Sequence, residues 1–232
     1  MQTVLITGAN RGLGLEFCQQ YAQQGWRVLA CCRKPDEASA LQQLATEYTD
    51  SVQVLALDVV DHAQIDALAI QLHDISIDVL ISNAGVYGDT FGHGFGQLDY
   101  QNWRATFEIN VLAGVKMAEA FNAQLLRSQQ GVLVAISSLM GSMADNGSGG
   151  SILYRSSKAA LNAAMKSLAI DLQAQGVGVL IFHPGWVKTD MGGQNALIDT
   201  QTSIQGMRQV IAQFDLAQTG SFIKYDGSPM PW

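Results

Sequence analysis

Short apolar stretches alternate with amphipathic stretches along nearly the whole chain, and this alternation constrains the fold more than any other feature. Stretches such as "TVLIT", "RVLACC" and "GVLVAIS" are almost continuous apolar runs, as is typical of strands that are covered on both faces. The stretches between them carry apolar residues at helical spacing. Strands that alternate with helices imply βαβ crossovers, and therefore a parallel sheet with helices on both sides.

The spacing places these elements along the sequence, and no repeat, low-complexity tract or linker interrupts them. We therefore expect one domain over residues 1–232. Strands are expected at 3–7, 27–32, 52–57, 77–82, 131–137, 177–183 and 221–225. Helices are expected at 13–24, 36–48, 62–74, 100–126, 154–172 and 204–214.

Composition excludes several classes of protein. Hydrophobic residues make up 48% of the 232 residues and charged ones 14%, which argues against disorder. The net charge of −7 disfavours nucleic acid and anionic membranes as general partners. No apolar run is long enough to cross a bilayer, and "MQTVLITGAN" lacks the features of a secretory signal. We therefore expect a cytoplasmic protein.

The cysteines and histidines do not indicate a disulfide or a metal site. Cys18, Cys31 and Cys32 are an odd number without CxxC spacing, and we expect reduced thiols that serve as small core residues. Cys31 and Cys32 adjoin on a predicted strand, so their side chains should point to opposite faces. The four histidines form no cluster with the spacing of metal ligands.

The stretch "TGANRGLG", Thr7 to Gly14, follows the first strand and opens a helix. Gly8 permits a tight turn, and Gly12 and Gly14 let the backbone come close to a pyrophosphate and to the sheet. The helix start then offers free N–H groups and a partial positive charge to an anion. Strand, loop, helix and second strand fall in order, so the sequence predicts nucleotide binding.

The end of the second predicted strand bears on the choice of nucleotide. An acidic residue there would bond the 2′-hydroxyl of NAD, but this chain has Cys32, followed by Arg33 and Lys34. With Arg11 in the glycine loop, an arginine pair could hold a 2′-phosphate. We therefore expect NADP(H) in preference to NAD(H). The alternative is that Arg33 and Lys34 merely solvate a loop.

Tyr154 and Lys158 stand four residues apart at the start of a predicted helix, so they share one face. A phenol has a pKa near 10, and a neighbouring ammonium lowers that pKa. At the carboxyl edge of a parallel sheet, where such sheets bind ligands, the pair would make a tuned proton donor. A chance YxxxK on a helix is the alternative.

The motifs together resemble one family. "TGANRGLG", "SNAG" (82–85), Asn110 in a long helix, "ISS" (136–138), "YRSSK" and "HPGWVKTD" resemble the short-chain dehydrogenase/reductase family, in family order over nearly the whole chain. The amino-acid sequences of these motifs are most similar to those of the subgroup of C-factor-like proteins and sniffer-type carbonyl reductases. The resemblance implies a single Rossmann-type, doubly wound parallel sheet of about seven strands flanked by helices.

The resemblance also assigns catalytic roles. Tyr154 would exchange a proton with the carbonyl oxygen, and Lys158 would lower the pKa of Tyr154 and bond the nicotinamide ribose. Ser138 would donate a hydrogen bond to the substrate oxygen, and Asn110 would hold a water that relays protons to Lys158. The catalytic set is therefore Asn110, Ser138, Tyr154 and Lys158.

A larger set of residues is implied to hold the cofactor. Asn83, Ala84 and Gly85 would line its adenosine side, and Asp58 with Val59 would meet the adenine. Residues of "PGWVKT" would cradle the nicotinamide and its phosphate. In full, the set is Gly8, Asn10, Arg11, Gly12, Leu13, Gly14, Cys32, Arg33, Asp58, Val59, Asn83, Ala84, Gly85, Tyr154, Lys158, Pro184, Gly185, Val187 and Thr189.

Each assignment has a purely structural alternative. Asn110 could cap or kink its helix. Ser137 rather than Ser138 could face the site, because neighbours on a strand point opposite ways. Asp58 could be an ordinary turn residue at a strand end, and Thr189 could cap a following helix.

Two connections would shape the substrate site. The 139–153 connection is long for the family, and Met140 and Met143 could give it a soft apolar wall or pack it onto the body. The segment after Thr189 has glycines that suit a mobile lid. Substrate-wall and packing roles both remain open for a set of aromatic residues: Tyr87, Phe91, Trp186 and Trp232.

The sequence therefore predicts an NADPH-dependent reductase of a ketone or aldehyde, or the reverse alcohol dehydrogenase. An NADP-binding regulatory or signalling protein with little turnover is the alternative. The set Asn110, Ser138, Tyr154 and Lys158 favours catalysis, because a protein that only binds has no need of all four. The resemblance also implies a homodimer or homotetramer joined through the helices near 100–126 and 152–174.

Overall fold

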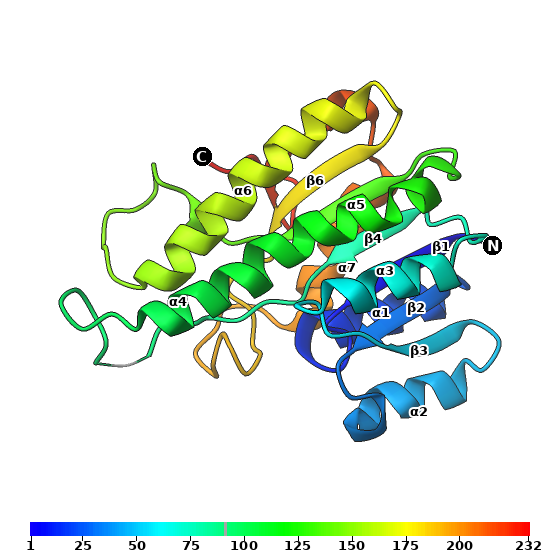
Figure 1. Cartoon of the computed structure of the whole chain (residues 1–232), viewed down its shortest axis with the longest axis horizontal. Coiled ribbons are helices and arrows are strands. Elements are labelled where there is room, and N and C mark those ends of the chain that lie inside the picture. The colour runs from blue at the N-terminus through cyan, green and yellow to red at the C-terminus, as the bar shows by residue number, and fades with distance from the viewer. Residues whose placement is uncertain (91) are drawn as a thin grey trace.

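A computed structural model, which describes residues 1–90 and 92–232, contains seven parallel strands in one sheet (Figure 1). Their order is β3-β2-β1-β4-β5-β6-β7, so the predicted doubly wound α/β fold is confirmed. The strands are β1 Thr3–Thr7, β2 Arg27–Cys32, β3 Val52–Ala56, β4 Val79–Ser82, β5 Val132–Ile136, β6 Gly178–His183 and β7 Ser221–Lys224.

Helices cover both faces of this sheet (Figure 1). None of those in the described ranges combines the length and the apolar character needed to cross a membrane. The α-helices are α1 Gly12–Gln23, α2 Ser39–Glu47, α3 His62–Gln71, α4 Tyr100–Phe107, α5 Ala113–Leu126, α6 Ile152–Gln173 and α7 Thr200–Ala212. A π-helical segment, Glu108–Leu112, joins α4 to α5, and short 3₁₀ turns lie at Pro35–Glu37, Leu139–Gly141 and Leu216–Gln218.

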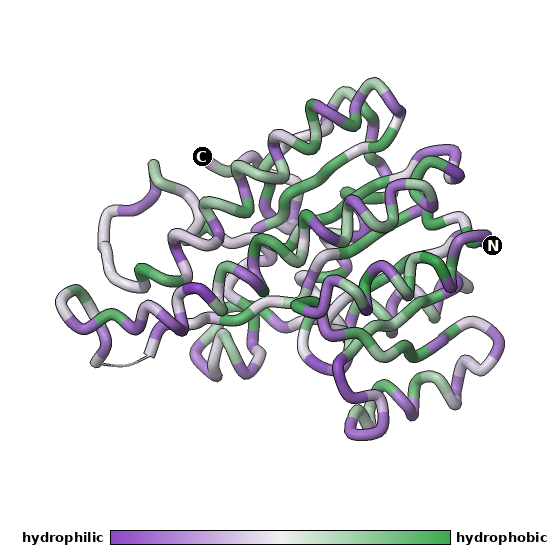
Figure 2. The backbone as a smooth tube through the Cα atoms, viewed as in Figure 1, coloured by the Kyte–Doolittle hydropathy of each residue, from purple (hydrophilic) through white to green (hydrophobic). Residues whose placement is uncertain are grey.

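The apolar core has two layers because side chains alternate along each strand. In β1, Leu5 packs toward α3, α5 and α6, whereas Val4 and Ile6 pack toward α1, α2 and α7. Cys31 and Cys32 likewise fall into opposite layers, as predicted, and all three cysteines carry free, buried thiols. Figure 2 shows hydrophobic residues concentrated on the strands and on the inward sides of the helices.

The strand order reverses between β1 and β4, and this switch point positions the site. β1 pairs with β2 on one side and with β4 on the other. In open α/β sheets such a reversal leaves a crevice at the carboxyl ends of the strands. The segments after β1, β2 and β4 therefore meet there, which brings together the glycine loop, Arg33 and Asn83.

Four predicted helices differ from the observed ones by three or more residues at one end, or in continuity. The helix expected at 62–74 ends at Gln71. The helix expected at 36–48 begins only at Ser39, because Pro35–Glu37 form a 3₁₀ turn. The helix expected at 100–126 is interrupted by the π-helical segment. The helix expected at 204–214 begins at Thr200, because the Asp199 carboxylate accepts a hydrogen bond from the backbone N–H of Thr202.

Candidate active site

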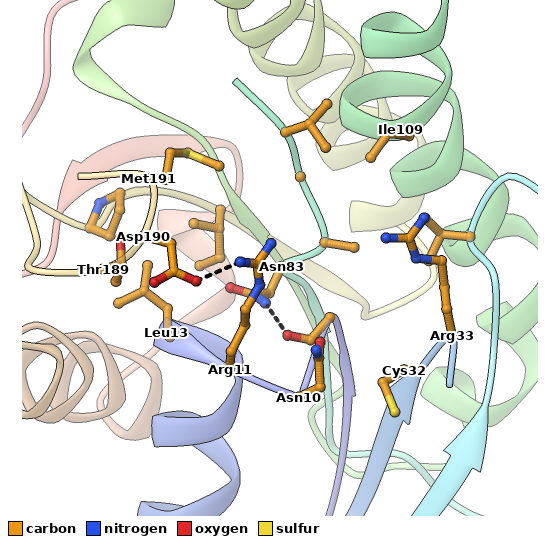
Figure 3. A pocket seen from close by; sticks show the side chains of 18 of the residues that line it. Asn10, Arg11, Leu13, Cys32, Arg33, Asn83, Ile109, Thr189, Asp190 and Met191 are labelled. Atoms are coloured by element: carbon orange, nitrogen blue, oxygen red, sulfur yellow. Dashed lines mark hydrogen bonds and ion pairs between the residues drawn. The ribbon is translucent and has the colours of Figure 1, made fainter. Parts of the chain in front are cut away.

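A cleft of about 500 Å³ opens beyond the carboxyl ends of the strands (Figure 3). Most of the predicted site residues line it, from six separate segments of the chain. They are Gly8, Asn10, Arg11, Gly12, Leu13, Cys32, Arg33, Asp58, Val59, Asn83, Ala84, Gly85, Tyr154, Lys158, Pro184 and Thr189. Five other predicted residues, which the structure also describes, do not line the cleft: Gly14, Asn110, Ser138, Gly185 and Val187.

The glycine loop has the backbone that its sequence predicts. Gly8 and Gly12 have φ of +65° and +54°, a region that favours glycine. A Cβ on Gly14 would lie 2.2 Å from the Gly8 carbonyl oxygen, so Gly14 lets the helix pack against the loop. The Asn83 amide donates to the carbonyl oxygens of Thr7, at 2.9 Å, and Gly8, at 3.2 Å. Asn83 thus holds the loop in place from β4.

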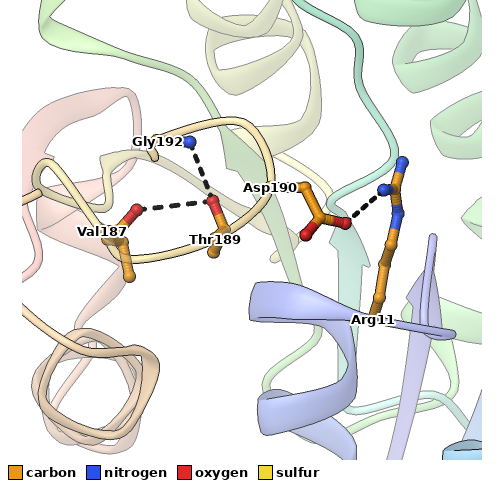
Figure 4. A network of polar contacts seen from close by, with 5 residues as sticks. All are labelled: Arg11, Val187, Thr189, Asp190 and Gly192. Carbon is orange, nitrogen blue, oxygen red and sulfur yellow. Dashed lines mark hydrogen bonds and ion pairs between the residues drawn. The ribbon is translucent and has the colours of Figure 1, made fainter. Parts of the chain in front are cut away.

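The cationic residues near the loop have different surroundings. Arg33 is exposed beyond the end of β2 and lines the cleft, whereas Lys34 pairs with Glu37 at 2.8 Å. Arg11 reaches across the cleft mouth to Asp190, with 2.5 Å between guanidinium and carboxylate (Figures 3 and 4). Of the two neighbouring cations, Arg33 is therefore the one that faces the cleft.

Tyr154 lies in the first turn of α6 and is only 8% exposed. Burial raises the pKa of its phenol to about 12, although the Ser138 hydroxyl beside it acts in the opposite direction. The pKa of this phenol is therefore raised, and the lowering predicted from Lys158 is wrong. Removal from water disfavours the charged phenolate, and the phenol keeps its proton at neutral pH.

Lys158 lies one turn further along α6, with its Nζ 5.7 Å from the centre of the Tyr154 ring. It is 4% exposed, and its ammonium donates to the Ile136 carbonyl oxygen at 2.8 Å. Burial lowers the pKa of Lys158 to about 8, because a low-dielectric setting disfavours the charged form. The ammonium has three N–H donors, and this bond uses one of them.

Asn110 occupies the π-helical segment, and such segments often occur at functional sites. Its side chain accepts from the Val86 N–H at 2.8 Å and donates to the Val86 carbonyl at 2.9 Å. It also donates to the Ser157 hydroxyl at 2.9 Å, which in turn donates to the Tyr154 carbonyl at 2.8 Å. Asn110 thereby ties the segment after β4 to the helix that carries Tyr154.

Two neighbouring serines at the end of β5 have different surroundings. The Ser137 hydroxyl is buried and donates to Asn162 at 2.5 Å, whereas the Ser138 hydroxyl lies beside the Tyr154 phenol. The Leu139 N–H, next along the chain, donates to His183 Nδ1 at 3.1 Å. Burial lowers the pKa of His183 to about 4, so this acceptor is neutral near pH 7 and holds the turn after Ser138.

A model of the short-chain dehydrogenases matches residues 2–197. The chain belongs to the short-chain dehydrogenase family. The C-signal protein of Myxococcus xanthus is 40% identical over 156 residues, which cover 67% of this chain and 93% of that protein.

Solved structures of this family resemble the whole chain. The carbonyl reductase Sniffer of D. melanogaster is 33% identical with a TM-score of 0.92, and the likeness covers 100% of both chains. NADPH-bound carbonyl reductase from chicken fatty liver is 30% identical with a TM-score of 0.92, over 100% of this chain and 99% of that one. The protein is therefore an oxidoreductase of the short-chain dehydrogenase family, with carbonyl reductases among its structural neighbours.

In this short-chain dehydrogenase the segment after β6 folds over one side of the cleft (Figure 4). Gly185 has φ of +87°, and Val187 is buried and pairs with Ile198. The Thr189 hydroxyl accepts from the Gly192 N–H at 3.1 Å. Thr189 therefore holds a turn and does not cap a helix, which was the structural alternative for this residue.

Asp58 lies where both of its predicted interpretations place it, at a strand end beside the cleft. It lines the cleft, and its carboxylate also accepts from the Val60 N–H at 3.2 Å, as in an ordinary turn. The Gln64 side chain accepts from the Asp58 N–H and so fixes this turn to the start of α3.

The aromatic residues proposed as a substrate wall have separate environments. Tyr87 packs on Tyr154, with 4.9 Å between ring centres. Trp186 is half exposed and donates to the Gly192 carbonyl at 2.7 Å. Trp232 packs on Phe222, and its carbonyl oxygen accepts from the Ser142 hydroxyl at 3.0 Å, so it holds the 139–153 connection. Phe91 lies outside the described residues.

Of the two methionines in that connection, Met143 is 77% exposed and therefore does not pack the loop onto the body. Met140 is half-buried. The described residues contain no group of three or more His, Cys, Asp or Glu side chains that could hold a metal ion.

Several cleft residues escaped the sequence-based prediction. They are apolar residues or residues of the β6 loop: Leu57, Val86, Ile109, Ile136, Lys188, Asp190 and Met191. Ser137, the predicted alternative to Ser138, also lines the cleft. Position after a strand end was the available signal for Leu57 and Val86. The proximity of Asp190 to Arg11, 179 residues apart in sequence, had no local signal.

Proposed function

We propose that the protein reduces ketones or aldehydes with NADPH, or oxidises the corresponding alcohols with NADP. The observation that carries the proposal is that Tyr154 and Lys158 line the same cleft as the glycine loop and Arg33. Oxidation of NADPH by the protein in the presence of a panel of ketones and aldehydes tests it. Binding of NADPH without turnover on any member of the panel would contradict it.

The residues present fit a dinucleotide phosphate. Helices α3, α4 and α7 begin with aspartates whose carboxylates accept their first N–H groups. The start of α1 differs from these. In the structure described, the side chain of its N-cap residue, Arg11, accepts no hydrogen bond from the helix, and the first turn holds no acidic residue. Its N–H groups are thus free for an anion. The residues that would hold the cofactor are those that line the cleft, with Gly14, Gly185 and Val187 shaping its walls.

The chemistry follows from the surroundings of each group. When bound, the dinucleotide supplies or accepts the hydride. Tyr154 holds a proton at neutral pH and would deliver it to the carbonyl oxygen during reduction. The Ser138 hydroxyl beside it would donate to the same oxygen, which stabilises the charge that develops there. Lys158 keeps a positive charge near the phenol below pH about 8.

Asn110 would act by holding other groups of the site in position. It fixes Val86 and, through Ser157, the Tyr154 backbone. Any water relay to Lys158 would start from this network. A Cβ on Gly85 would lie 3.2 Å from the Asn110 oxygen and 3.5 Å from Lys158 Nζ, so Gly85 keeps space between the two side chains.

Preference for NADP(H) over NAD(H) rests on Arg33, with Arg11 as its partner. Hydrogen bonds to charged groups contribute about 1.5–3 kcal/mol, so we expect Arg33→Ala to weaken NADPH binding roughly 10- to 100-fold. NADH lacks the 2′-phosphate, and its affinity should change little. Isothermal titration with both cofactors measures the ratio.

Lys34→Ala is the matched control for this measurement. Lys34 is the adjacent cation, but it pairs with Glu37, so we expect the preference to remain. An unchanged ratio of NADPH to NADH affinity in Arg33→Ala would show that Arg33 does not bind the 2′-phosphate.

A signalling function with little turnover is the second candidate, since the C-signal of Myxococcus xanthus is a relative. The presence of Asn110, Ser138, Tyr154 and Lys158 favours the reductase, because binding alone needs no proton donor. We also propose self-association through the helical stretches near 100–126 and 152–174, where Leu112, Leu126 and Ile170 are exposed. A cytoplasmic location remains our expectation.

A further inference from the structure

The first turn of α6, which carries Tyr154, is held by a carboxylate from another part of the chain. Asp89 lies in the connection between β4 and α4, and its carboxylate accepts from the N–H groups of Leu153 at 3.2 Å and Tyr154 at 2.8 Å. The first N–H groups of a helix have no partner within the helix. A negative charge there also interacts favourably with the helix dipole.

The residues directly before α6 supply no equivalent cap. Gly149 and Gly150 have positive φ, and Ser151 has φ of +45°, the left-handed region that a non-glycine residue seldom adopts. Within the described chain the Ser151 side chain gives no cap to α6. Its hydroxyl instead bonds the Tyr87 hydroxyl at 2.6 Å. The start of this helix therefore depends on the remote Asp89.

Tyr154 is held on three sides by the segment that contains Asp89 and by the Asn110 network. Asp89 accepts from its backbone N–H, and the Ser157 hydroxyl donates to its carbonyl at 2.8 Å. The ring of Tyr87 packs on its ring. Asn110 bonds both Ser157 and Val86, so one connected structure fixes backbone and ring together.

We propose that Asp89 is a positioning residue for Tyr154: it caps α6 from the β4–α4 connection and so fixes the phenol relative to the cleft. The catalytic consequence rests on the reductase function proposed above. Catalytic groups act only within a narrow geometry, and a displacement of about 1 Å can cost roughly 100-fold in rate. A frayed first turn would displace the phenol while the glycine loop, on the other side of the cleft, stays in place.

Three variants test this role: Asp89→Ala, Asp89→Asn and, as a matched control, Asp61→Ala. Asp61 also caps a helix, accepting from Gln64 N–H at the start of α3, but it does not touch α6. The measurements are kcat and KM for the reduction of a carbonyl substrate, NADPH affinity, and amide hydrogen exchange over residues 151–156.

For Asp89→Ala we expect kcat to fall about 10- to 100-fold, NADPH affinity to stay within about threefold, and exchange at Leu153 and Tyr154 to accelerate. Asp89→Asn keeps one oxygen acceptor but places its NH2 group, a donor, against the other backbone N–H. It should therefore restore only part of kcat and of the protection. Asp61→Ala should leave kcat and the exchange of α6 unchanged. If Asp89→Ala is not recovered folded, Asp89→Gln, whose longer side chain displaces the acceptor, replaces it in the same comparison.

Wild-type kcat together with wild-type exchange in Asp89→Ala would overturn the inference. A loss of NADPH affinity equal to the loss of kcat would also overturn it, since that pattern indicates general damage. If the wild type reduces no carbonyl, the proposed function fails separately. The exchange data then still decide whether Asp89 holds the first turn: acceleration supports this, and unchanged protection contradicts it.

Discussion

Tyr154→Phe should lower kcat for carbonyl reduction by about 100- to 10,000-fold, the usual range for loss of a general acid, while NADPH still binds. The substitution removes one oxygen from a ring that is 8% exposed and packed on Tyr87. Because the pKa of this phenol is about 12, the wild-type group carries its proton across the neutral range. Steady-state rates of NADPH oxidation and a direct binding titration measure the two quantities separately.

Tyr100→Phe is the control for this substitution. It makes the same chemical change on α4 at a side chain that is 62% exposed, and we expect rates equal to those of the wild type. Equal rates in Tyr154→Phe and the wild type would remove the phenol from the mechanism. Loss of NADPH binding in Tyr154→Phe would show instead that the hydroxyl serves the cofactor.

Lys158→Met should lower kcat/KM for NADPH by roughly 100-fold or more, because charge-assisted hydrogen bonds and a charge beside the phenol are lost together. It should also change the pH dependence. In the wild type the ammonium is present below its pKa of about 8 and is lost above it. The wild-type kcat/KM, which reports groups of the free enzyme, should therefore fall as pH rises above about 8.

That alkaline decline should be missing in Lys158→Met, because methionine does not titrate. Lys166→Met provides the comparison. Lys166 lies on the same helix and its ammonium donates to the Gly220 carbonyl at 3.3 Å, but its side chain is exposed on the surface. We expect it to keep the wild-type rate and pH profile. An alkaline decline that persists in Lys158→Met would assign the titration to another group.

The strands were the most predictable part of the fold. β1 and β2 begin and end where their apolar runs do, because both faces of a central parallel strand are buried and every residue carries the signal. Helix ends were less predictable. The start of α7 depends on Asp199 and on Ser203, whose hydroxyl donates to the Pro184 carbonyl at 2.6 Å, a contact that periodicity does not contain.

The π-helical segment illustrates a different limit. Residues 100–126 have helical spacing throughout, yet Asn110 pairs with both backbone groups of Val86. Local periodicity cannot reveal a bond between residues 24 apart in sequence. The sequence did single out Asn110 through its family resemblance, and a kink of its helix was one of the interpretations left open.

The candidate site divides in the same way. Tyr154, Lys158 and the glycine loop could be predicted because their spacing is local and carries chemistry. The pKa of Tyr154 could not, because it depends on burial by residues from distant segments. The bonds from Asp89 to α6 join residues 64 and 65 positions apart. Such contacts follow from the packing of the whole sheet and its connections.

Transfer of deuterium to a carbonyl substrate from NADPH that carries deuterium at both nicotinamide C4 positions tests the central claim most directly. Mass spectrometry of the product alcohol locates the label. We predict deuterium on the carbinol carbon with the wild-type protein, and a product yield reduced at least 100-fold with Tyr154→Phe. A protein that binds the labelled cofactor, yet transfers deuterium to no ketone or aldehyde tested, would contradict the assignment of this cleft to hydride transfer.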